Sequence, residues 1–154
     1  MCERFRYAGK GRCRLPHFRV LREQAPKDLR FLAVKRAEGV ERKPVAAGRA
    51  TEVQVLVGPA DGAPNFALRR FIMGAGGGMP RHTNTVEHEQ YILNGKARIG
   101  IAEDVFEVKK GDVVFIPENI PHWYQNIGDE TFEFLCVVPN KVDKTTILSD
   151  ELPC

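Results

Sequence analysis

Three of the four histidines in this chain have a spacing that suits ligands to one metal ion. His82 and His88 lie in one segment and His122 lies in a second, and each segment combines a turn glycine with a hydrophobic run. Neutral imidazole is the commonest metal ligand, and the ligands of one ion usually converge from separate elements. The pattern therefore predicts a mononuclear metal site formed by these histidines. Asn84 is either a weak fourth oxygen ligand or a neighbour of metal-bound water.

Three uncharged nitrogen ligands would leave a divalent ion its full charge and open positions for water, substrate or dioxygen. Nitrogen ligation suits Fe, Mn, Ni, Cu and Zn, and the sequence does not choose among these metals. The alternative is a barrel whose histidines make only hydrogen bonds. A glycine run at 74–78 precedes His82 but lacks the Gly-Lys-Ser/Thr of a phosphate loop. We therefore expect this run to be a turn that delivers His82, and we predict no organic cofactor.

Two adjacent arginines include a candidate anion-binding group. Consecutive side chains on a strand point to opposite faces, so one of Arg69 and Arg70 should point into the fold. A buried charge is costly unless it meets a partner or an anionic ligand. The inward arginine is therefore a pocket candidate, and the alternative is an arginine that lies at the surface or in an interface.

The last predicted strand contributes two further pocket candidates, Phe134 and Cys136, which share one face of that strand. If that face points inward, these two residues border the metal, and the alternative is that they only pack in the core. Trp123 and Tyr124 follow His122 directly. Alternation predicts that one of them lines the pocket or core while the other lies at the surface or in a dimer contact.

These residues lie on short predicted strands separated by turn residues, which is typical of an all-β sandwich or barrel. The Asn94-Gly95 pair between two apolar strands predicts a two-residue hairpin, because both central positions of that turn need positive φ. The predicted strands span residues 51–57, 66–73, 89–93, 97–102, 105–108, 113–116, 123–126 and 131–138.

The two histidine segments resemble the two signature motifs of the cupin superfamily over about residues 40–140. Gly111, Pro117, His122 and Asn126 match the second motif, and Asn119 stands at the position of its internal glycine. Asparagine adopts positive φ more readily than most residues, so this replacement is mild. The resemblance implies a double-stranded β-helix, or jelly-roll barrel.

The first motif departs from the superfamily pattern at two positions. Asn84 stands where the family has its second histidine, and His88 stands at the glutamate position. The chain resembles a subset of small single-domain cupins that has histidine at this second position and builds a four-histidine metal centre. Strand alternation and the spacing to the hairpin glycine place His88 on the inner face with Gln90, and Glu89 on the outer face. The family analogy favours Arg69 as the inward arginine, and it implies a homodimer.

Residues 1–38 are predicted to form a basic extension, and residues 39–154 the barrel with a short C-terminal tail. Residues 1–50 contain 14 Lys and Arg against 5 Asp and Glu, a net charge of +9, whereas residues 51–154 contain 9 against 15, a net charge of −6. We expect the extension to pack on the acidic body of its own or a neighbouring subunit. It lacks aromatic interleaving and a recognition-helix pattern, so nucleic acid is not a predicted partner.

The sequence contains no apolar run of the length that a membrane helix needs and no secretory signal, which predicts a cytoplasmic protein. The four cysteines lack a C-x2-C spacing, and free thiols are expected in a reducing compartment. The alternative for Cys2 and Cys13 is a bridge or a weak metal pair.

Three functions from different classes fit these residues. The first is a metal-dependent oxygenase or other oxidoreductase that acts on a small organic molecule. The second is a non-redox enzyme, such as a sugar or sugar-acid isomerase, epimerase or lyase, in which Arg69 holds a carboxylate or phosphate. The third is a non-catalytic module that binds a small ligand or a metal and acts as a sensor.

Overall fold

The computed structural model describes residues 34–149. The predictions for residues 1–33, including the fate of Cys2 and Cys13, lie outside the described residues. Within them, neither helical turn is long or apolar enough to cross a bilayer. The elements are η1 (Ala37–Gly39), β1 (Lys43–Pro44), β2 (Arg49–Val57), η2 (Pro59–Asp61), β3 (Phe66–Thr83), β4 (His88–Asn94), β5 (Lys96–Ile101), β6 (Asp104–Lys109), β7 (Val113–Ile116), β8 (His122–Asn126), β9 (Phe132–Pro139) and β10 (Thr146–Ile147).

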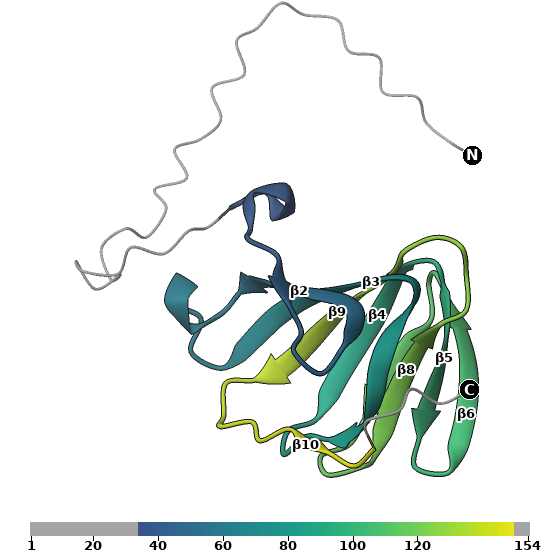
Figure 1. Ribbon diagram of the computed structural model, residues 1–154. Helices are drawn as coiled ribbons and strands as arrows, with labels where there is room; N and C mark the ends of the chain where they lie inside the picture. The colour runs from purple at the N-terminus through teal and green to yellow at the C-terminus, as the bar shows by residue number, and fades with distance from the viewer. Residues whose placement is uncertain (1–33, 150–154) are drawn as a thin grey trace, which may run out of the picture.

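The strands form one antiparallel sheet that curls strongly on itself (Figure 1). The order of the sheet is β6-β5-β8-β3-β9-β4-β7, with β2 and β10 also paired to β3 and β1 paired to β2. Strand β3 is central because its first half pairs with β2 and β9, while its second half pairs with β8 and β10. The prediction of an all-β jelly-roll barrel is confirmed.

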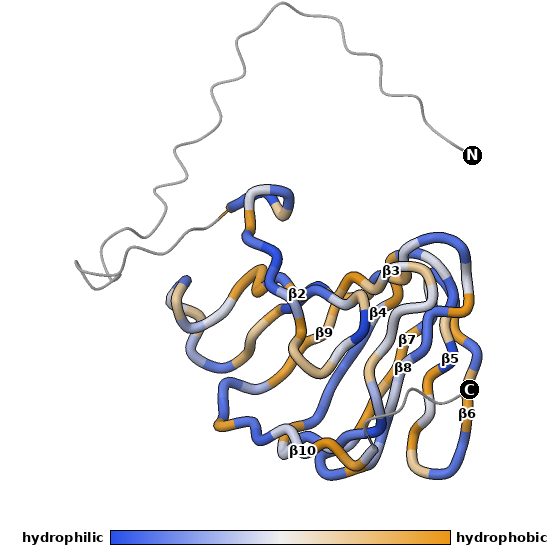
Figure 2. The backbone as a smooth tube through the Cα atoms, viewed as in Figure 1, coloured by the Kyte–Doolittle hydropathy of each residue, from blue (hydrophilic) through white to orange (hydrophobic). Residues whose placement is uncertain are grey.

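The core lies inside the curled sheet and follows from alternation along the strands. Strand β9 alternates strictly between buried and half-buried residues, and β4 begins with the same period. In Figure 2, hydrophobic stretches lie along several strands of the curled sheet. The buried residues that pack together are Ala67, Met73, Met79, Val86, Ile92, Ala97, Ile99, Val108, Val114, Ile116, Tyr124, Phe132, Phe134, Cys136 and Val138.

The predicted turn at 74–78 is wrong, because β3 continues through these glycines to Thr83. The reason is the close approach of neighbouring strands. A Cβ on Gly78 would lie 2.2 Å from the carbonyl oxygen of Tyr124 on β8, and one on Gly77 would lie 2.8 Å from that of Arg49 on β2. Glycine here therefore permits tight pairing, and only Gly76 of this run has positive φ, at 64°.

The predicted Asn94-Gly95 hairpin is also wrong, although the turn itself is present. Gly95 has φ of 73°, but Asn94 does not have positive φ. The strands β4 and β5 do not pair with each other, because β4 pairs with β7 and β9 whereas β5 pairs with β6 and β8. The side chain of Asn94 donates a hydrogen bond to the carbonyl of Thr131, at 3.0 Å. This contact holds the corner against the start of β9, so the two strands leave it toward different neighbours.

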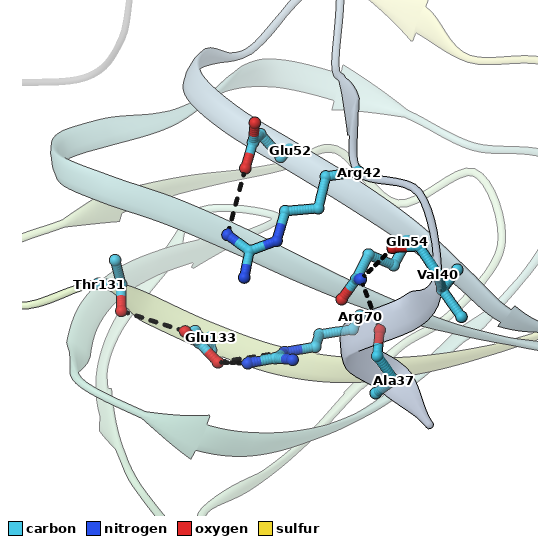
Figure 3. A network of polar contacts seen from close by, with 8 residues as sticks. All are labelled: Ala37, Val40, Arg42, Glu52, Gln54, Arg70, Thr131 and Glu133. Atoms are coloured by element: carbon cyan, nitrogen blue, oxygen red, sulfur yellow. Dashed lines mark hydrogen bonds and ion pairs between the residues drawn. The ribbon is translucent and has the colours of Figure 1, made fainter. Parts of the chain in front are cut away.

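The chain that enters the barrel is attached to β2 by polar contacts. The side-chain Nε2 of Gln54 donates hydrogen bonds to the backbone carbonyls of Ala37 and Val40, at 2.9 and 2.6 Å. Lys35 forms a salt bridge with Asp61, at 2.6 Å. Figure 3 shows the Gln54 bonds beside a second network in which Arg70 reaches Glu133. Residues on both sides of the predicted boundary at 38/39 therefore contact the barrel.

Candidate metal centre and inner cavity

The fold brings the three predicted histidines together inside the barrel. His82 on β3 and His122 on β8 are cross-strand partners, and their ring centroids lie 4.2 Å apart. His88, the first residue of β4, has its ring centroid 5.3 Å from that of His122. All three side chains are buried. We refer to them below as the histidine cluster.

Backbone carbonyls fix the tautomer of two members of the histidine cluster. The Nδ1 atoms of His82 and His122 lie 2.7 and 2.8 Å from the carbonyl oxygens of Pro80 and Ile120, respectively. A carbonyl oxygen only accepts hydrogen bonds, so each Nδ1 carries the proton and each Nε2 keeps its lone pair. The same arrangement orients metal-bound histidines in proteins. The Nε2 atoms of His88 and His122 are buried without a hydrogen-bond partner among the described residues.

Burial keeps the histidine cluster uncharged. It lowers the pKa of His88 to about 3, and further causes are the positive charge of Arg69 and the repulsion from His122 or His82 when either ring is protonated. Burial and the neighbouring His82 lower the pKa of His122 to about 4, against the opposing hydrogen bond to the Ile120 carbonyl. Burial also lowers the pKa of His82. The cluster therefore presents neutral imidazoles, the protonation state that metal binding requires.

The donor set fits a divalent metal in its chemistry, but the side chains do not form a closed coordination sphere. Within residues 34–149, no group of three or more His, Cys, Asp and Glu side chains stands ready to hold a metal ion as the side chains lie. The two unpartnered Nε2 atoms of His88 and His122 are the feature that fits, because a buried nitrogen lone pair without a partner is costly. An ion bound here would have to draw the rings together.

Asn84 lies beside the histidine cluster and holds a segment that the sequence reasoning missed. Its Nδ2 donates to Asp143 Oδ2 at 2.8 Å and to Thr145 Oγ1 at 2.9 Å, while its Oδ1 is buried and has no hydrogen-bond partner within residues 34–149. Asp143 also accepts from the backbone amide of Thr85, at 3.2 Å. Residues 142–147, which we call the strap, thus cross one side of the site. Nothing in the local sequence marks the strap, because its place depends on β10 pairing with β3.

A cavity of about 440 Å³ lies next to the histidine cluster, and we call it the inner cavity. Its volume is within the usual range of small-molecule sites. Most of its wall is apolar, and two stacked pairs of aromatic rings lie along it. The ring centroids of Phe71 and Phe134 are 5.1 Å apart, and those of Tyr124 and Phe134 are 5.4 Å apart. The polar residues of its lining are Arg69, His82, Asn84, His88, Gln90, Asp143 and Thr145.

The predicted pocket candidates divide between the wall of the inner cavity and the layer behind it. Arg69 lines the cavity, and Arg70 points to the other face, where it pairs with Glu133. Phe134 is part of the wall, whereas Cys136 is fully buried and receives a hydrogen bond from Arg69 Nη2 at 3.3 Å. The predicted alternation is confirmed for both arginines.

Alternation also holds at β4, where His88 and Gln90 are buried and Glu89 and Tyr91 are exposed. The prediction that one of Trp123 and Tyr124 would be exposed is wrong, since they are 8 and 3 % exposed. Trp123 packs over Gly100, where any Cβ would lie 1.9 Å from its Nε1. The absence of a side chain at Gly100, on the neighbouring strand, therefore leaves the space in which Trp123 is buried.

Comparisons with known proteins agree with this architecture. Residues 69–138 match the family described as the cupin domain. The polyketide cyclase RemF from Streptomyces resistomycificus is 27 % identical with a TM-score of 0.70, and the match covers 77 % of this chain and 88 % of that one. A cupin-2 domain protein from Rhodospirillum rubrum is 28 % identical with a TM-score of 0.65, over 77 % of this chain and 82 % of that one.

A shorter match reaches a curated enzyme. The oxalate decarboxylase OxdC of Bacillus subtilis is 42 % identical over 59 residues, which are 35 % of this chain and 15 % of that protein. The chain spans less than half the length of the curated relatives that it matches. The resemblance to cupins with a four-histidine centre stays a prediction.

Proposed function

Residues 69–138 belong to the cupin domain family, and we propose that this cupin is a metal-dependent enzyme for a small molecule with an anionic oxygen group and an apolar body. The observation that carries the proposal is the neutral histidine cluster beside an apolar cavity that also contains an inward arginine. His82, His88 and His122 would hold the metal, with Asn84 Oδ1 as a weak oxygen donor. The metal would be Fe, Mn, Ni, Cu or Zn, and it would supply Lewis-acid polarisation of a bound oxygen.

The remaining roles fall to residues of the inner cavity. Arg69 would hold the anionic group of the substrate, because its Nε is buried without a partner among the described residues. The rings of Phe71 and Phe134 would pack on the apolar body and exclude water. An apolar wall does not suit a sugar, whose hydroxyl groups need many polar partners, so we place sugars below apolar acids as substrates.

The inward arginine favours a non-redox reaction of the lyase, isomerase or cyclase type. Such reactions need an anionic group held in place and a carbonyl or enolate oxygen that is polarised. The likenesses to a polyketide cyclase and to an oxalate decarboxylase support this class. A metal-dependent oxygenase is the second candidate, and the stacked aromatic wall supports it because a phenol or catechol would pack there.

The test is turnover of a panel of aromatic and aliphatic keto and hydroxy acids by metal-loaded protein, with and without dioxygen. We expect substrate loss without dioxygen, and we expect Arg69→Leu to abolish it while Arg70→Leu on the opposite face retains it. Turnover only with dioxygen would assign the oxygenase instead. Tight binding of a panel member without turnover would support a non-catalytic sensor instead of an enzyme. Equal activity of the two arginine variants would contradict the role of Arg69.

We also propose that the chain forms a homodimer through the outer face of β4 and β7. Tyr91 and Val113 are cross-strand partners on that face and are 48 and 75 % exposed, and Phe115 beside them is 55 % exposed. A second copy of the chain would cover these apolar side chains and the edge strand β7. Sedimentation of Val113→Glu should give a monomer where the parent protein gives a dimer, and a monomeric parent protein would end the proposal.

A further inference from the structure

A row of polar side chains crosses the interior of the barrel, one step along the strands from His88. Arg69 on β3, Cys136 on β9 and Gln90 on β4 are in register across three neighbouring strands. Gln90 is 3 % exposed and Cys136 is fully buried. Gln90 lies on the same face of β4 as His88, so the row borders the histidine cluster but is distinct from it. Burying an amide and a guanidinium in this place is costly unless both find partners.

The partner of Gln90 is the phenol of Tyr124. Gln90 Nε2 donates to Tyr124 Oη at 2.6 Å, and Tyr124 is itself 3 % exposed. The phenol oxygen thus accepts one hydrogen bond from protein and retains its own proton to donate. A phenol keeps that proton at neutral pH. Tyr124 is therefore a hydrogen-bond donor at the wall of the inner cavity.

Two polar atoms of this group are left without partners among the described residues. They are Gln90 Oε1 and Arg69 Nε, both buried, and both residues line the inner cavity. The Oε1 end of the Gln90 amide is therefore unpaired among the described residues, and a ligand in the cavity is the group that can pair with it.

We propose that Gln90 and Tyr124 form a hydroxyl-binding subsite that selects substrates with a phenol or enol hydroxyl beside the anionic group. A hydroxyl is the group that can donate to Gln90 Oε1 and at the same time accept from Tyr124 or Arg69. The stacked rings of Phe71, Phe134 and Tyr124 along the wall suit a flat, aromatic body for the same molecule. This inference rests on the proposed function and assigns Gln90 as a specificity-determining residue.

The test compares three probes that share a carboxylate on a naphthalene ring and differ only in the group beside it. They are 3-hydroxy-2-naphthoate, 3-methoxy-2-naphthoate and 2-naphthoate. Calorimetry on the full chain should show that the hydroxyl compound binds at least about tenfold more tightly than the methoxy compound, which cannot donate. In Gln90→Met this preference should fall to within about twofold, while the affinity for 2-naphthoate is unchanged. Tyr124→Phe should reduce the preference, and the exposed neighbour variant Tyr91→Phe should retain it.

The outcomes separate this inference from the proposed function. Hydroxyl preference is measured on metal-free as well as metal-loaded protein, so it does not depend on the metal or on turnover. Metal binding and turnover without hydroxyl preference would overturn the subsite alone. Absence of binding of all three probes, or a full preference retained in Gln90→Met, would also overturn it. If Gln90→Met does not fold, the preference of the parent protein and its change in Tyr124→Phe still give the answer.

Discussion

His82 and His122 face each other across β3 and β8 as register partners, with ring centroids 4.2 Å apart. Each ring places its Nδ1 against the carbonyl oxygen two residues earlier, that of Pro80 or of Ile120. Each strand therefore sets the tautomer of its own histidine and aims Nε2 away from its own backbone. This symmetry is the strongest geometric support for the proposed metal site, because the second nitrogen of a metal-bound histidine usually makes such a bond.

The neighbours His88 and Glu89 allow a sharp test of which residue of β4 serves the metal. His88 is buried beside the other rings, and Glu89 is exposed on the opposite face. We predict that His88→Gln lowers the metal content of protein purified without added metal from about one equivalent by at least about tenfold, since a direct ligand is lost. Glu89→Gln should retain the metal, as measured by elemental mass spectrometry.

His122→Ala extends the same measurement to the opposite strand and should also remove the metal. Metal retained by both histidine variants, or lost from the Glu89 variant alone, would show that the histidine cluster is not the binding site. Parent protein without metal that also fails to bind any of the five candidate ions on titration would leave the histidines as polar core residues.

Acid should destabilise the metal-free protein through its histidines. In the unfolded chain His88 and His122 titrate near the ordinary histidine pKa of about 6.5, whereas in the fold their pKa values are lowered to about 3 and about 4. Between these values the unfolded chain binds more protons, so the free energy of unfolding falls as the pH falls from about 6.5 toward about 4. Each histidine should contribute roughly 1.4 kcal/mol per pH unit in that window.

The measurement is urea unfolding of metal-free protein at several values between about pH 7 and about pH 4.5. His88→Gln cannot take up that proton, so its free energy of unfolding should depend less steeply on pH than that of the parent protein. Parallel curves for the two proteins would mean that His88 is charged in the fold or titrates normally.

We predict that Asn84 matters more for anchoring the strap than for binding the metal. Asn84→Ala removes the bonds to Asp143 and Thr145 and is expected to cost about 1–2 kcal/mol of unfolding free energy. The amide of Leu148, which bonds to the Arg81 carbonyl at 2.8 Å, should then exchange hydrogen faster. Lys144→Ala, an exposed change within the strap, should leave that exchange unchanged. Equal exchange in the Asn84 variant and the parent protein would contradict the role of Asn84 as an anchor.

Local sequence is sufficient to predict the structure where strand alternation or a single backbone angle decides it. The alternation that buries His88 and Gln90 and exposes Glu89 is confirmed, because β4 has no register shift over those residues. Asn119 has φ of 61°, as its place at a motif glycine predicts. The predicted jelly-roll barrel follows from such short, regular strands and from the two motifs.

Sequence reasoning failed where contacts between distant segments decide the structure. Asp143 reaches the site only through the pairing of β10 with β3, and Trp123 is buried only because Gly100 lies beneath it. Strand alternation predicts Gln90 on the inner face, but its bond to Tyr124 joins strands that are not neighbours in the sheet. No local pattern encodes these pairs, because each depends on how tightly the whole sheet curls.

The glycines of β3 give a final test of that curl. Gly78 lies so close to β8 that a Cβ would be 2.2 Å from the Tyr124 carbonyl oxygen, a backbone atom that cannot move alone. Gly78→Ala must therefore push β3 and β8 apart, and we expect a loss of about 2–4 kcal/mol in urea unfolding. The same two strands hold His82 and His122 in register, so the variant should also bind metal more weakly. Gly39→Ala is the matched control, because no atom of the described part of the chain lies within 4 Å of its added Cβ, and its stability should be unchanged. Equal stability of the two variants would mean that β3 and β8 are not paired as closely as described.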